Sequence, residues 1–187
     1  MIQPSQLRVR RGHARSSPSQ FSRDELDWIE RHGIENLLGR AKTADTLAKE
    51  ASLTLSLTLA GTVGALAYAV KVFSGELTYA NVGFGCASVW LMAVSMFLVF
   101  GCLRVSAMPP IYNEPGKLLS RVDSGASFEQ WRIGELHNID DRIRKAAHRN
   151  RGVANRLNTA RALAAMTPLV SSAALWILCG EVGLLCR

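Results

Sequence analysis

The sequence has few of the side chains on which enzymes and metal sites depend. It contains four cysteines and four histidines in 187 residues, and the histidines are dispersed. The sequence contains no HExxH pair, GxSxG, Walker loop or GxGxxG motif. We therefore expect a protein that is not an enzyme, with no catalytic residues, no metal and no cofactor. The cysteines lie in or beside apolar stretches, where we interpret them as small packing residues: Cys86, Cys102, Cys179 and Cys186.

Charge is missing altogether from three stretches of the chain, Ala51–Val70, Val82–Leu103 and Ala162–Gly180. A helix rises ~1.5 Å per residue, so each stretch is long enough to cross a hydrocarbon core of ~30 Å. The first stretch begins with strict alternation, but a lone strand would leave its backbone groups unsatisfied in lipid. The sequence therefore predicts an all-α integral membrane protein with three transmembrane helices and a helical cytoplasmic part.

Basic residues crowd into two polar segments. Of the 22 lysines and arginines, nine precede the first apolar stretch and eleven lie between the second and the third. The positive-inside rule places both of these segments in the cytoplasm. We expect the loop 74–81 and the tail 181–187 to lie outside, in a multi-pass protein of the plasma membrane.

The chain divides into segments by charge, proline content and helix-start signals. Two capping boxes, Ser22–Glu25 and Ser127–Gln130, mark the starts of two cytoplasmic helices. The second helix is expected to continue into the third span, with a break near Gly152 as an alternative and a kink at Pro168. The expected segments are a disordered basic arm (1–21), an amphipathic cytoplasmic helix (22–50), a transmembrane helix (51–73), a second transmembrane helix (80–103), a Pro-rich elbow (104–126), a basic cytoplasmic helix (127–161) and a third transmembrane helix (162–180).

No acidic residue interrupts the run from Arg142 to Arg161. One interpretation is juxtamembrane charge that sets topology and touches anionic lipid. The other is a site for an anionic ligand such as a nucleotide, an oligonucleotide or a phosphoinositide-like headgroup, on helix faces that converge in an oligomer. The candidate ligand-binding residues are Arg142, Arg144, Lys145, Arg149, Arg151 and Arg156.

Hydroxyl side chains line one side of the first span. Thr54, Thr58 and Thr62 follow one another at four-residue spacing, so they share a helix face. Such a line is typical either of tight packing between helices or of the wall of a narrow pore. No charged residue lies in the middle of a span, and three spans cannot form an inverted repeat, so a conduit would require a homo-oligomer.

The layout resembles the small transmembrane effectors of bacterial antiviral defence, including those of CBASS, Pycsar and Hailong-type systems and the two-span SLATT proteins. The resemblance rests on a cytoplasmic N-terminal helix, a tight pair of spans, a long basic helix and the elbow Pro109–Pro115. It implies a homo-oligomer in the bacterial inner membrane that forms a channel or disrupts the membrane. It also implies control by a nucleotide second messenger that a partner enzyme makes.

These observations lead to two functional hypotheses. The first is an oligomeric, ligand-controlled channel or pore that acts in abortive infection, with the basic run as sensor and the threonine line as pore lining. The alternative is a membrane-anchored interaction or scaffold protein that does not conduct.

Overall fold

The structure, a computed structural model, describes residues 22–72, 78–104, 110 and 127–181, with side chains described as far as residue 177. Every element in these residues is helical, which confirms the predicted all-α fold for this part of the chain. The basic arm and nearly all of the Pro-rich elbow lie outside the described residues. The elements are α1 (Arg23–Val72), α2 (Tyr79–Leu98), the π-helical turn η2 (Val99–Leu103), α4 (Phe128–Ala165) and α5 (Thr167–Glu181).

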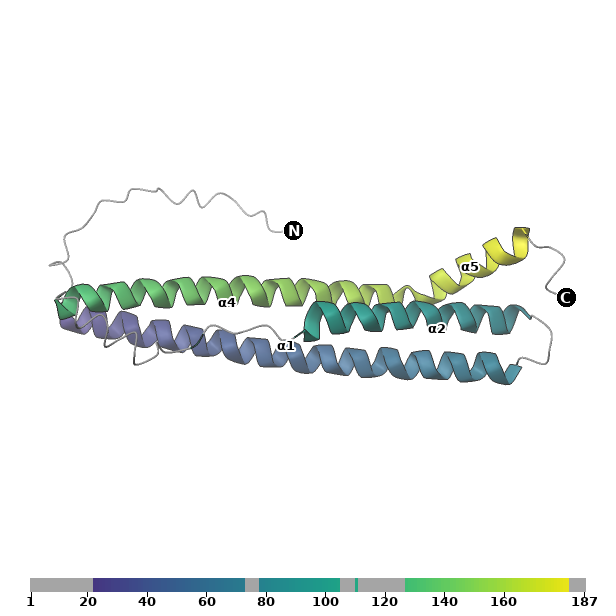
Figure 1. Cartoon of the computed structure of the whole chain (residues 1–187), viewed down its shortest axis with the longest axis horizontal. Coiled ribbons are helices and arrows are strands. Elements are labelled where there is room, and N and C mark those ends of the chain that lie inside the picture. The colour runs from purple at the N-terminus through teal and green to yellow at the C-terminus, as the bar shows by residue number, and fades with distance from the viewer. Residues whose placement is uncertain (1–21, 73–77, 105–109, 111–126, 182–187) are drawn as a thin grey trace, which may run out of the picture.

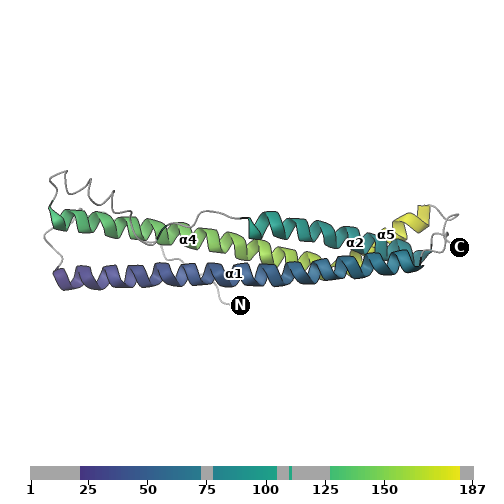
Figure 2. The same ribbon diagram turned by 60° about the horizontal axis from the view of Figure 1, so that its bottom comes forward.

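The helices form a long, thin bundle (Figure 1). α1 and α4 run side by side in the same direction, and α2 returns antiparallel to them over the second half of α1 (Figures 1 and 2). α5 turns away from the line of α4 and packs on α2. We call the paired segments 23–50 of α1 and 128–156 of α4 the stalk.

Both predicted capping boxes are formed. The Ser22 hydroxyl accepts a hydrogen bond from the Glu25 N–H at 3.2 Å, and the Glu25 carboxylate accepts one from the Ser22 N–H at 2.7 Å. The same reciprocal pair joins Ser127 and Gln130 at 3.3 and 3.4 Å. The Ser22 backbone N–H, and secondarily its hydroxyl, holds the pKa of Glu25 below its usual value. These caps satisfy N–H groups that the first turn of a helix otherwise leaves without partners.

Glycine allows the two stalk helices to come close together. A Cβ atom at Gly33 would lie 2.9 Å from the Ile139 Cγ2 atom, which is closer than two carbon atoms pack. Gly33 and Gly39 do not interrupt α1, which is a single helix of 50 residues from the stalk to the end of the first apolar stretch. At the far end of the stalk, Arg132 forms ion pairs with Asp27 and Glu30, the latter at 3.0 Å.

Three helices meet where the stalk joins the apolar part of the bundle. Ala51 of α1, Val94 and Leu98 of α2, and Leu157 and Ala160 of α4 form one buried cluster. Small residues on α1 and α4 allow Leu98 and Leu157 to become almost fully buried. This junction core fixes how the stalk is set on the apolar helices.

The break in the last long helix lies at Met166, not at Gly152. α4 passes through Gly152 without interruption, and α4 and α5 meet at an angle of 49°. Pro168 has no N–H to donate to the Ala164 carbonyl, and the Thr167 hydroxyl donates to that carbonyl instead, at 2.6 Å. Trp90 Nε1 of α2 donates to the neighbouring Leu163 carbonyl at 3.0 Å, which ties the break to α2.

Two described helices, α1 and the segment Tyr79–Leu103, are long and apolar enough to cross a membrane, and the bent pair α4–α5 qualifies as a third if it counts as one span. Large apolar side chains cover their outer surfaces; Leu57 is 74% and Trp176 is 81% exposed. Such surfaces are consistent with a membrane protein, because lipid solvates them well.

Candidate anion-binding grooves

The basic residues of α4 divide between two sides of that helix. Arg144 and Arg151 line a groove between α4 and α1, whereas Arg149 and Arg156 line a second groove between α4 and the end of α2. Arg142 lines neither of these grooves and lies 3.6 Å from Glu135. The predicted site is therefore separated into two, and sequence periodicity alone could not show which helix would cover which side.

The first, which we call the stalk groove, opens between α1 and α4 and has a volume of about 810 Å³. Arg40 contributes from α1, and the α4 side carries Arg144, His148 and Arg151. The Asn150 side chain, 6% exposed, donates to the Arg40 carbonyl at 2.8 Å and fixes the two helices at this level. The groove thus gathers basic side chains from two helices that are far apart in sequence.

The electrostatics of the stalk groove favour an anion. None of the described residues that line it is acidic. Arg144 pairs with Asp140 at 2.6 Å, outside the groove lining, and both side chains are largely exposed. An exposed pair of this kind contributes little stability, so Arg144 can exchange its partner for a phosphate at little cost.

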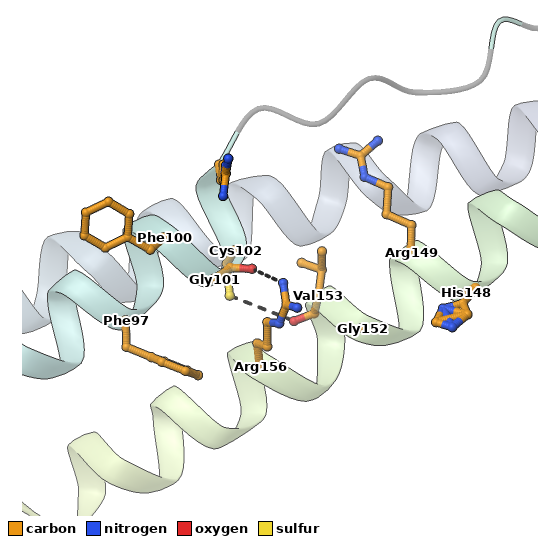
Figure 3. A pocket seen from close by; sticks show the side chains of 10 residues that line it. Phe97, Phe100, Gly101, Cys102, His148, Arg149, Gly152, Val153 and Arg156 are labelled. Carbon is orange, nitrogen blue, oxygen red and sulfur yellow. Dashed lines mark hydrogen bonds between the residues drawn. The ribbon is translucent and has the colours of Figure 1, made fainter.

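The second groove, which we call the junction groove, lies where α2 ends and has a volume of about 780 Å³ (Figure 3). Phe97 and Phe100 form one end of its lining and Arg149 stands toward the other. Arg156 lies between them and donates to the Gly101 carbonyl at 2.9 Å. Arg104, the residue after η2, also lines this groove.

Sequence reasoning missed Arg40 and Arg104 as members of these grooves. Arg40 sits at the end of an expected amphipathic helix and Arg104 at the start of an expected elbow. Only the parallel register of α1 and α4, and the place where α2 stops, bring them beside the basic run. Lys145, in contrast, is exposed and lines neither groove.

The threonine line lies inside the protomer. Thr54, Thr58 and Thr62 are 9%, 5% and 6% exposed. Ser95 of α2 donates to the Thr58 hydroxyl at 2.9 Å, and the Thr62 hydroxyl donates to the Thr58 carbonyl at 2.8 Å. The geometry therefore supports the packing alternative for these three residues within one protomer.

Replacing Thr58 by Phe is expected to destabilise the packing of α1 on α2 by about 1–3 kcal/mol. The phenyl ring is larger than the threonine side chain and has no space beside Ser95. Thermal unfolding in detergent measures the effect. The matched control is Leu57→Phe, on the outer surface of the same turn, which is expected to leave the unfolding temperature unchanged. Equal stability of the two variants would place Thr58 outside the helix interface.

Within the described ranges, no three His, Cys, Asp or Glu side chains come together as the ligands of a metal ion would. No protein-family model, curated protein or solved structure matches the chain. The chemistry of the two grooves therefore carries the functional argument.

Proposed function

We propose that this protein is an oligomeric membrane effector that binds a nucleotide-like anion in the stalk groove and controls a conduit through the membrane. The observation that carries the proposal is the convergence of Arg40, Arg144 and Arg151 on one groove whose described lining residues include no acid. A volume of about 810 Å³ lies within the range of small-ligand sites. The proposed setting is the bacterial inner membrane, with the stalk in the cytoplasm; a role in antiviral defence rests on the resemblance of the layout alone.

Binding in this groove would act on two helices at once. A phosphate group held by Arg40 of α1 and Arg151 of α4 would fix the spacing of the stalk helices through charge-assisted hydrogen bonds. α1 continues without a break into its apolar half, and α4 leads to the bend at Met166. A change in the distance between the two stalk helices would therefore move the apolar helices, because the junction core connects them to the stalk.

The conduit in this proposal lies between protomers, because Thr54, Thr58 and Thr62 are buried within one chain. The opposite side of α1 carries Ser52 and Ser56, which are exposed, and Gly64, beside which an added Cβ would meet no atom within 4 Å. Neighbouring copies would approach α1 closely along this side.

A second candidate function is a non-conducting, membrane-anchored interaction protein. Two exposed aromatic side chains near the end of the stalk favour it, Trp28 at 63% and Phe128 at 72% exposure. Aromatic side chains are enriched where proteins bind one another. In that case the stalk would bind a soluble protein, and the membrane would remain tight.

Equilibrium binding to the full chain in detergent tests the proposed ligand class. Mononucleotides and cyclic dinucleotides are expected to bind, with affinity that falls as salt rises, and the corresponding nucleosides are expected not to bind, since they lack the phosphate that the arginines recognise. Binding of nucleosides as tight as that of nucleotides, or no binding of either, would contradict the proposal. The mass of the protein–detergent complex, measured on the same preparation, gives the oligomeric state.

A further inference from the structure

The junction groove joins an apolar end to a basic end. Phe97 and Phe100 belong to the apolar segment Tyr79–Leu103, and Phe100 is 72% exposed. Arg104 follows directly after that segment, and Arg149 faces the groove from α4. In Figure 3 the two phenylalanines stand at one side and Arg149 at the other.

We propose that the junction groove binds an anionic phospholipid, with its phosphate between Arg104 and Arg149 and the start of its acyl chains beside Phe97 and Phe100. The groove shares His148 and Gly152 with the stalk groove but none of its arginines, so this inference does not depend on the proposed function. The position of the groove indicates the class of ligand. The groove lies at the end of an apolar helix that is long enough to span a membrane. If that helix spans the bilayer, its end lies at the depth of the lipid phosphates.

The charge of the groove complements one class of lipid headgroup. None of its described lining residues is acidic, whereas Arg104, Arg149 and Arg156 carry positive charge. A headgroup with a net negative charge gains from these side chains, and a zwitterionic headgroup brings its own cation into the same space. The groove is therefore expected to prefer anionic lipids to zwitterionic ones.

Backbone atoms of η2 and Gly152 form part of the groove wall. η2 is a π-helical turn that ends the segment Tyr79–Leu103. Arg156 donates to the Gly101 carbonyl in this turn at 2.9 Å, and a guanidinium has further N–H groups to donate to a phosphate. Gly152 also lines the groove, and an added Cβ there would meet no atom within 4 Å. A larger side chain at Gly152 would therefore fill the groove that glycine leaves open.

The test measures the thermal stability of the full chain in neutral detergent as lipid is added, because a ligand that binds only the folded state raises the unfolding temperature. The probes are phosphatidylglycerol, phosphatidylcholine and the soluble headgroup sn-glycerol 1-phosphate. Phosphatidylglycerol is expected to raise the unfolding temperature more than phosphatidylcholine, and the soluble headgroup is expected to have no effect at equal concentration. An equal rise with both lipids would overturn the proposal, and so would an equal rise with the soluble headgroup, which would identify a free phosphate as the ligand.

Two matched double variants locate the effect. Arg104→Gln with Arg149→Gln is expected to shift the phosphatidylglycerol titration to roughly thirtyfold higher concentration. Arg40→Gln with Arg144→Gln, which removes the same charge from the stalk groove, is expected to leave the lipid titration unchanged. Arg104→Lys with Arg149→Lys keeps the charge and is expected to retain most of the response, which separates loss of binding from loss of folding. Equal lipid titrations for the wild-type chain and the Arg104→Gln, Arg149→Gln variant would overturn the assignment.

Discussion

Replacing Arg40, Arg144 and Arg151 together by Gln is expected to weaken nucleotide binding by at least about a hundredfold. Each charge-assisted hydrogen bond contributes ~1.5–3 kcal/mol, and ~1.4 kcal/mol is a tenfold change in affinity. Three such bonds exceed two powers of ten even when their contributions overlap. Equilibrium binding of a labelled cyclic dinucleotide to each purified chain measures the change.

The control for this variant removes the same number of charges elsewhere. Arg31, Lys42 and Lys145 are exposed and line neither groove. Their triple replacement by Gln should leave binding within a few-fold of the wild-type chain at 0.15 M salt, because none of these side chains lines the groove and salt weakens the effect of exposed charges. If both triple variants lose affinity equally, the ligand responds to net charge and the stalk groove is not its site.

Leu98→Ala is expected to destabilise the junction core by about 2–3 kcal/mol. Leu98 is fully buried against Val94, Leu157 and two alanines, so truncation leaves a cavity that the rigid helices cannot close. The cost lies toward the lower end for buried leucines, because lipid solvates the separated helices better than water does. Unfolding in mixed micelles with increasing dodecyl sulfate measures it.

Leu53→Ala is the matched control, since it removes the same atoms from a side chain that is 67% exposed on α1. This variant should unfold at nearly the same dodecyl sulfate fraction as the wild-type chain. Similar losses for the two variants would mean that Leu98 is no more tightly packed than a lipid-facing residue, and the junction core would then not couple the stalk to the apolar helices.

The sequence predicted the helical elements well because their signals are local. Uncharged stretches, capping boxes and a proline can each be recognised in one continuous piece of sequence. They predict the helical segments that form α1, α2, α4 and α5. The bend was predicted at Pro168 with a break near Gly152 as an alternative, and it occurs at Met166. A missing N–H at Pro168 breaks the hydrogen-bond ladder, whereas Gly152 only lowers helix propensity, which the packing of α4 overrides.

The grooves depend on which helices become neighbours, and local sequence patterns do not contain that information. The basic run was predicted to contain one ligand site, but α1 covers one side of α4 and the end of α2 meets the other, so Arg151 and Arg149 line different grooves. Thr58 fits a pore wall and a helix interface equally well by spacing. Its contact with Ser95 depends on the antiparallel register of α2, which no local pattern encodes.

The most direct test of the central claim is the ionic conductance of the full chain in planar bilayers, with and without the nucleotide that binds it best. We predict discrete openings from a defined oligomer whose probability changes when the nucleotide is added on the stalk side, and no such change for the Arg40, Arg144 and Arg151 triple variant. A well-assembled protein that binds nucleotide and stays silent at all voltages would contradict the claim and leave the non-conducting interaction protein.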